Sequence, residues 1–188
     1  MSADPYGENK AARYVAGKER NPARRLSRWL EARAVRRAAG GGTLVLDMPS
    51  GAGRFPGAIA CDRSAAMAAL AHAAGRRTVR GDAFALPFAD NAFDRALCVR
   101  LLHHFDAPER RRMLHELARV APVAVITYFG TEGRRAKRRA ARAKSRTRRA
   151  LSRQELAADC AAAPWRVVSD RAVIPFWSEQ RVVRLERK

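Results

Sequence analysis

Three short strand-like runs in the first half of the chain each end in an aspartate. They cover residues 43–47, 58–62 and 78–82. The first two are continuous apolar runs that close in a carboxylate, which is typical of strands buried on both faces of a parallel sheet. Ligands bind beyond the carboxyl ends of such strands, so we expect Asp47, Asp62 and Asp82 to converge at one edge of a sheet.

Helical and strand-like patterns alternate along the rest of the chain. Helices are predicted over residues 22–39, 64–74, 108–120 and 152–163, and further strands over 93–99, 123–129, 165–176 and 179–185. Residues 177–178 leave room only for a tight reversal, so the last strand should be antiparallel. The predicted fold class is α/β, an open and mostly parallel sheet.

The 188 residues predict one sizeable core, with a basic helical segment over residues 1–40 and a single domain over 41–188. The first predicted helix has an apolar stripe made by Leu26, Trp29, Leu30, Ala34 and Val35. Only residues 48–57 connect the first two strands, and a proline and a glycine at 56–57 break any helix there. The first crossover helix is therefore expected to shrink to about one turn, leaving a flank for a partner or the N-terminal helix to cover.

The net charge of +20 is concentrated in a few segments. Ten of the residues from 134 to 149 are Lys or Arg, and none is Asp or Glu. Such a run suits an arm that binds RNA, phospholipid or a phosphorylated saccharide. A solvated linker enriched in arginine is the alternative. The run contains no aromatic residue, so base stacking has no local support.

Several classes of protein are disfavoured by the sequence. No apolar run approaches the roughly 20 residues of a membrane span, and the first residues lack the features of a signal peptide, so we expect a cytoplasmic protein without a transmembrane segment. Cys61, Cys98 and Cys160 are widely spaced in apolar surroundings and are interpreted as buried thiols. The histidines show no metal-ligand spacing, so no metal site is predicted.

The loop after the first strand carries Gly51 and Gly53, where a backbone without a Cβ can turn sharply and approach a ligand. Together with an acidic strand end, the loop indicates a nucleoside cofactor pocket. Four segments, 45–53, 61–67, 81–94 and 101–105, resemble in order the motifs of the class I S-adenosylmethionine-dependent methyltransferases, in particular type 11-like domains. The resemblance covers roughly residues 44–129 and implies a Rossmann-like fold with S-adenosylmethionine as cofactor.

The resemblance also implies roles for the acidic strand ends. Asp62 would accept hydrogen bonds from the two ribose hydroxyls, which suits an ionised carboxylate. Asp82 would bind the adenine amino group, with the backbone N–H of Ala83 nearby. One aspartate alone would favour a helix N-cap or a turn, whereas three at corresponding strand ends favour a cofactor.

The same resemblance assigns the glycine loop to the methionine part of the cofactor. Gly51 and Gly53 would let the backbone pass close to it, and Asp47 would lie near its ammonium group or orient the loop. The remaining residues implied to contact the cofactor are Met48, Ser50, Arg63 and Val99.

Catalysis in this family consists chiefly of holding a nucleophile in line with an already activated methyl group. His103 or His104 is the candidate general base for a hydroxyl acceptor, and the alternative is that each only shapes a turn. Cys98 lies inside a predicted strand and is interpreted as core rather than as a covalent nucleophile. No Asn-Pro-Pro-Tyr-like tetrapeptide follows that strand, which argues against methylation of an exocyclic amino group of a base.

The resemblance and the charge together predict a methyltransferase whose acceptor is a polyanion or a small molecule. A rival hypothesis is a catalytically degenerate fold that binds nucleic acid or protein, favoured by the short first crossover. A dinucleotide-binding oxidoreductase fits less well, because the acidic residue follows Gly51 by 11 positions rather than about 20.

Overall fold

The computed structural model describes residues 11, 13, 16–17, 21–131, 149–175 and 178–188. Apart from Arg149, the basic run 134–149 lies outside the described residues. No helix within the described part of the chain is long and apolar enough to cross a membrane.

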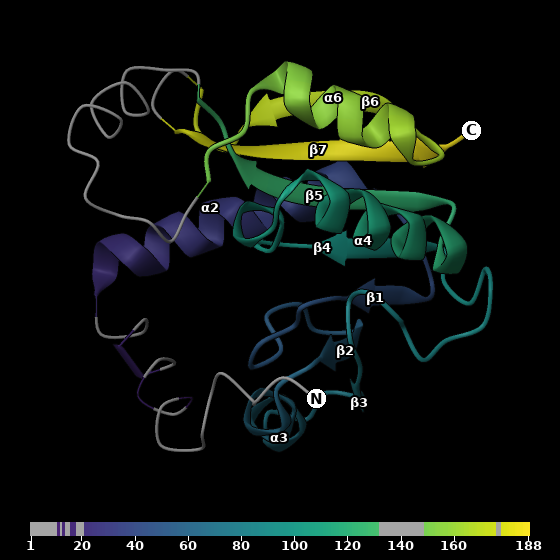
Figure 1. Ribbon diagram of the computed structural model, residues 1–188. Helices are drawn as coiled ribbons and strands as arrows, with labels where there is room; N and C mark the ends of the chain where they lie inside the picture. Colours follow the sequence, from purple (N-terminus) through teal and green to yellow (C-terminus); the bar gives the residue numbers. More distant parts are fainter. Residues whose placement is uncertain (1–10, 12, 14–15, 18–20, 132–148, 176–177) are drawn as a thin grey trace.

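Seven strands form one sheet in the order β3-β2-β1-β4-β5-β7-β6 (Figure 1). Their bounds are β1 Val45–Asp47, β2 Ile59–Asp62, β3 Thr78–Arg80, β4 Arg95–Cys98, β5 Val123–Phe129, β6 Trp165–Ala172 and β7 Gln180–Arg187. The first five strands are parallel, and β7 runs antiparallel to both β5 and β6. The predicted α/β fold with an antiparallel last strand is confirmed.

Helices cover both faces of the sheet, with α4 and α6 in front of it and α2 behind it in Figure 1. The helices are α2 Pro22–Ala39, α3 Ala65–Ala73, α4 Ala107–Val120 and α6 Arg153–Ala162, with a single 3₁₀ turn at Leu102–His104. Both α4 and α6 begin at a capping box, in which the N-cap side chain and a glutamate three residues later satisfy each other's backbone N–H groups. Both helices begin within one residue of the predicted starts, where these local signals lie.

The larger core lies between the sheet and the helices α4 and α6. Met113 and Leu117 of α4 are fully buried there against strand residues such as Leu46. Trp165 is 1% exposed, and its indole N–H donates to the carbonyl of Leu114 at 2.8 Å, so its polar atom is satisfied inside the core. The three cysteines, Cys61, Cys98 and Cys160, are buried and free, as predicted.

The predicted apolar stripe of α2 is wrong at its N-terminal end. Leu26 and Trp29 are 58% and 56% exposed, because this half of the helix projects beyond the sheet (Figure 1). The buried positions are Glu31, Ala32, Val35 and Ala39. Small alanines let the helix lie close to the strands, and the burial of Glu31 requires compensation of its charge.

The connection between β1 and β2 contains turns and no helix at all, so the first crossover is shorter still than the single turn expected. Phe55 from this connection is 4% exposed and packs in a second core cluster with Val35 and Ala32 of α2. The N-terminal helix therefore covers the connection from behind the sheet.

Candidate functional site

A cavity of about 790 Å³ opens at the carboxyl ends of β1 to β4. This volume falls within the range of small-molecule and cofactor sites. Every residue that the sequence assigned to the cofactor lines it except Asp47: Met48, Ser50, Gly51, Gly53, Asp62, Arg63, Asp82, Ala83 and Val99. Parallel pairing of the strands brings these segments together, because Asp47 is in register with Ala60 and with Leu97 of the neighbouring strands.

Asp62 ties the glycine loop to the start of α3. One of its oxygens accepts from the backbone N–H of Gly51 at 2.8 Å, and the other accepts from that of Ser64 at 3.0 Å. These two bonds fix the orientation of the carboxylate at the cavity, and a carboxylate oxygen can accept more than one hydrogen bond. The loop itself needs glycine at Gly53, which has a φ of +75° and where a Cβ would lie 2.6 Å from Cγ of Arg76.

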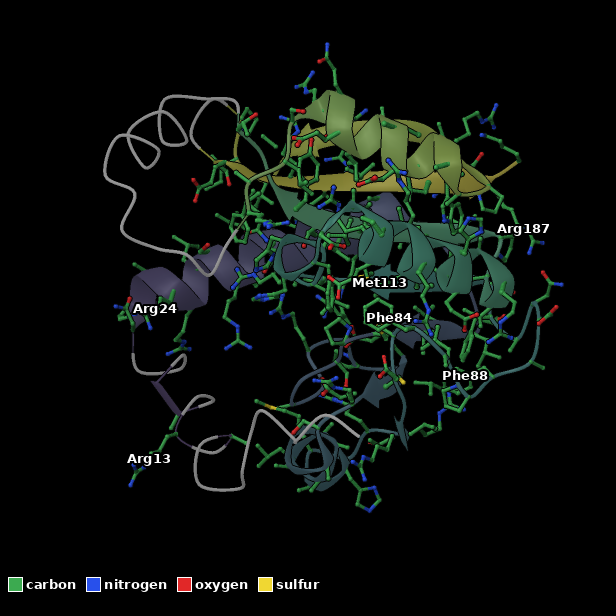
Figure 2. The ribbon with its side chains drawn as sticks, in the orientation of Figure 1. Arg13, Arg24, Phe84, Phe88, Met113 and Arg187 are labelled. Atoms are coloured by element: carbon green, nitrogen blue, oxygen red, sulfur yellow. The ribbon has the colours of Figure 1, made fainter. Side chains whose placement is uncertain are left out.

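Asp82 shapes the wall of the cavity next to β3. Its carboxylate accepts from the backbone N–H of Phe84 at 3.0 Å. The rings of Phe84 and Phe105 meet edge to face with centroids 5.0 Å apart, and both side chains line the cavity. Figure 2 shows Phe84 toward the middle of the molecule, whereas Arg24 and Arg187 lie at its periphery. The combination of an acceptor with aromatic faces suits a purine ring.

Asp47 lies beneath the cavity rather than on its surface, being 2% exposed and absent from the lining. Its Oδ2 atom is buried and has no hydrogen-bond partner among the described residues. Burial raises the pKa of this carboxyl from 3.8 to about 7, an effect that Arg54 opposes and Asp62 reinforces. The backbone N–H of Phe55 donates to this carboxyl group, so Oδ2 alone is an unsatisfied acceptor, which a cationic group could satisfy.

The two candidate histidines occupy different places. His104 lines the cavity, whereas His103 is 4% exposed and does not. The His103 ring packs edge to face on Phe129 with centroids 4.8 Å apart, and its carbonyl accepts from the N–H of Arg149 at 3.0 Å. Of the two histidines, His104 is therefore the one that a ligand in the cavity could contact.

A group of charged residues at the cavity was missed by the sequence analysis. Arg54 and Arg100 line the cavity and pair with the buried Glu31 of α2. In a chain so rich in arginine, neither arginine differs in pattern from its neighbours. The one available signal is that Glu31 is the only acidic residue in the 18 residues of α2.

The sequence model of the methyltransferase domain family matches residues 37–123, which include the glycine loop and all three acidic strand ends. The chain carries a class I S-adenosylmethionine-dependent methyltransferase domain. The strand order and the position of the cavity agree with this identification, and S-adenosylmethionine is the cofactor of such domains.

Two curated relatives match parts of this methyltransferase domain. "Probable tRNA methyltransferase 9B" of Bos taurus is 31% identical over 86 residues, covering 42% of this chain and 19% of the relative. "tRNA (carboxymethyluridine(34)-5-O)-methyltransferase" of Arabidopsis thaliana is 28% identical over 118 residues, covering 57% of this chain and 29% of the relative. The chain thus spans less than a third of the length of either relative.

Solved structures share the fold of the methyltransferase domain over most of the chain. A "SAM-dependent methyltransferase, possible histamine N-methyltransferase" from Thermotoga maritima has a TM-score of 0.72 at 23% identity, covering 87% of this chain and 90% of the other. Magnesium protoporphyrin IX methyltransferase from Synechocystis, with bound SAH, has a TM-score of 0.64 at 12% identity, covering 100% and 90%. At these identities the likeness concerns the fold.

Proposed function

We propose that this protein transfers the methyl group of S-adenosylmethionine to an RNA acceptor, with tRNA the first class to test. The cavity carries the proposal, because it brings the glycine loop and the carboxylates of Asp62 and Asp82 to one place. Beneath it, Oδ2 of Asp47 has no hydrogen-bond partner among the residues that the structure describes. The names of the two tRNA methyltransferase relatives and the net charge of +20 support RNA as the acceptor.

Within this proposal, different residues around the cavity bind different parts of the cofactor. Asp62 holds the ribose hydroxyls, and Asp82 with the backbone of Ala83 holds the adenine. The loop from Met48 to Gly53 follows the methionine part, whose ammonium group the free oxygen of Asp47 would attract. When bound, the cofactor supplies a methyl group already activated by its sulfonium, so the chain has to position the acceptor and exclude water.

The ribose assignment predicts a loss of cofactor affinity in Asp62→Ala. Removal of charge-assisted hydrogen bonds should weaken binding of S-adenosylhomocysteine by about 1.5–3 kcal/mol in titration calorimetry. Ser152→Ala, which removes an N-cap oxygen of α6 away from the cavity, serves as the folding control. Equal affinity of the wild type and the Asp62 variant would contradict the assignment.

Positioning rather than proton abstraction is expected to dominate catalysis. His104→Ala should then lower turnover by only a few-fold, with the affinity for S-adenosylhomocysteine unchanged. A general base would instead contribute about 10²–10⁴-fold. Single-turnover rates of the variant with saturating cofactor distinguish the two cases, and a drop beyond about 100-fold would make His104 the base.

The basic run 134–149 is expected to recruit the RNA and not the cofactor. Replacing six of its ten basic residues with Gln or Ser should weaken binding of tRNA, lower methyl transfer from tritiated S-adenosylmethionine, and flatten the salt dependence of binding. Each lost phosphate contact should reduce the log–log slope by about 0.9 for a duplex and 0.7 for a single strand. Affinity for S-adenosylhomocysteine should stay unchanged.

Anionic lipid vesicles serve as the second ligand in that experiment. Weakened binding to vesicles but not to tRNA would move the proposal to a lipid acceptor. If the wild type and the variant give the same binding curves with tRNA and also with vesicles, the run is a solvated linker. An RNA acceptor would then lose its main support from charge.

A second candidate function is a binding module with this fold and without turnover. It is favoured by the connection between β1 and β2, which has no helix beside the cavity. Such a module would bind tRNA with the same salt dependence while transferring no label, so the tritium assay separates the two functions.

A further inference from the structure

The side chains of Arg54 and Arg100 are fixed at the cavity by one fully buried carboxylate. Nη1 of Arg54 donates to Oε2 of Glu31 at 2.8 Å. Arg100 donates to the same carboxylate from two atoms, from Nε to Oε1 at 2.9 Å and from Nη2 to Oε2 at 2.8 Å. Gln180 of β7 also donates its side-chain amide to Oε1. The Glu31 side chain has no exposed surface, so this clamp holds both guanidinium groups in place.

The positive charge at this wall exceeds the negative charge that compensates it. The two guanidinium groups pair with the single carboxylate of Glu31, and Arg28 of α2 lines the same cavity as a third cation. The other acidic group near Arg54 is Asp47, whose pKa of about 7 leaves it only partly ionised at neutral pH. The pKa of Arg54 is lowered mainly by burial, and the nearby Arg100 and Arg28 lower it further while Glu31 opposes them. Partly buried cations in excess make a site for an anionic group.

The backbone at Arg100 is also held in a conformation that residues other than glycine rarely adopt. Its φ is +62°, and its N–H donates to the hydroxyl of Thr127 on β5 at 2.8 Å. Such strain persists only where the surroundings impose it, and it is concentrated at functional sites. Arg100 lies two positions after the end of β4 and lines the same cavity as His104.

The cofactor alone does not account for this charge. Its single carboxylate could neutralise one guanidinium, which would be that of Arg54 because this residue follows the glycine loop. Arg100 comes from the segment that follows β4, which also supplies His104 to the cavity lining. Its Nη1 atom has no hydrogen-bond partner among the described residues and is available to a ligand.

We propose that Arg100, supported by Arg54 and locked by Glu31 and Gln180, binds an anionic group that the methyl acceptor carries close to the reacting atom. The group is a carboxylate or a phosphate, since a guanidinium presents paired donors to both. This inference rests on the proposed function for the existence of an acceptor. It adds that Arg100, a cation inside the cavity, determines which acceptor is selected, and that this selection is independent of the basic run 134–149.

The test uses the full chain saturated with S-adenosylhomocysteine and labelled with ¹⁵N at arginine. Inorganic phosphate and acetate are titrated separately at constant ionic strength, and the side-chain Nε–Hε signals of Arg54 and Arg100 are followed by NMR. We expect at least one anion to shift these signals saturably. Arg100→Gln should weaken the response of Arg54 at least tenfold, and Arg100→Lys should retain part of it.

Arg37→Gln is the matched control, because it removes the same charge from an exposed position on α2. A response to acetate alone assigns a carboxylate, and a response to phosphate alone assigns a phosphate. No saturable shift, or the same response in Arg100→Gln as in Arg37→Gln, would overturn the proposal. A tenfold loss of S-adenosylhomocysteine affinity in Arg100→Gln would also overturn it, because Arg100 would then serve the cofactor.

These outcomes do not depend on turnover or on RNA. If tRNA accepts no methyl group while the anion response is present, the RNA acceptor fails and the anion subsite stands. If tRNA is methylated and the response is absent, the subsite fails alone.

Discussion

Glu31→Ala should destabilise the folded protein by about 3–5 kcal/mol. Removal of one partner from a buried ionic cluster leaves the other charges desolvated without compensation. Here the substitution leaves Arg54 and Arg100 without their counter-charge, and their side chains are only 17% and 29% exposed. It also deprives the buried amide of Gln180 of its acceptor.

Urea unfolding followed by circular dichroism measures this loss, and Glu186→Ala is its control. Glu186 also pairs with two arginines, Arg166 and Arg184, but it is 30% exposed at the end of β7. Exposed pairs contribute about 1 kcal/mol or less. A loss below about 1 kcal/mol in Glu31→Ala would show that solvent or rearrangement compensates the arginines, and the clamp described for Arg100 would fail with it.

Asp47→Asn should stabilise the ligand-free protein much more at pH 8 than at pH 5. The pKa of this carboxyl is raised to about 7 in the folded state against 3.8 unfolded, mainly by burial. Between these values the folded state holds a proton that the unfolded state has released. Its contribution to the free energy of unfolding therefore falls as the pH rises from about 4 to 7, and then levels off.

The magnitude follows from the distance between the two pKa values. At about 1.4 kcal/mol for each pH unit, ionised Asp47 costs on the order of 4 kcal/mol at pH 8, which the neutral amide avoids. For a chain of this length, a gain of 2–4 kcal/mol would raise Tm by roughly 5–15 °C. Melting curves of both proteins at pH 5 and pH 8 provide the measurement. If the difference in Tm between the variant and the wild type is the same at both pH values, the raised pKa is contradicted.

The same carboxyl links cofactor binding to pH. If a cationic group of the cofactor pairs with ionised Asp47, affinity should rise about tenfold from pH 6 to pH 8, with release of a proton on binding. Asp47→Asn should abolish that dependence and bind more weakly at pH 8. The destabilisation that ionised Asp47 causes in the free protein would then be offset when the cofactor binds. Such local destabilisation is common at functional sites.

Most of the fold could be predicted because local patterns and long-range pairing agree. The strand ending in Asp47, the strand ending in Asp62 and both capping boxes are visible in short stretches of sequence. The convergence of the acidic strand ends follows from parallel pairing alone. The cavity therefore lies where the sequence indicated, and of the residues assigned to the cofactor only Asp47 differs, because it lies beneath the cavity.

The parts that could not be predicted depend on how distant elements pack. The exposed side of α2 depends on where the sheet ends, so Leu26 and Trp29 appeared to belong to a buried stripe. Glu31 reaches partners that are 23, 69 and 149 residues away in the chain, and no periodicity encodes such contacts. The different surroundings of His103 and His104 likewise arise from the packing of His103 against Phe129 on β5.

Native mass spectrometry of the purified wild-type chain tests the central claim most directly. The protein is titrated in turn with S-adenosylmethionine, S-adenosylhomocysteine and NAD⁺. We predict one S-adenosylmethionine per chain, displaced by S-adenosylhomocysteine and not by NAD⁺, because the cavity places Asp62 and Asp82 around one nucleoside. Absence of either S-adenosyl ligand, or saturable binding of NAD⁺ in their place, would contradict the methyltransferase site.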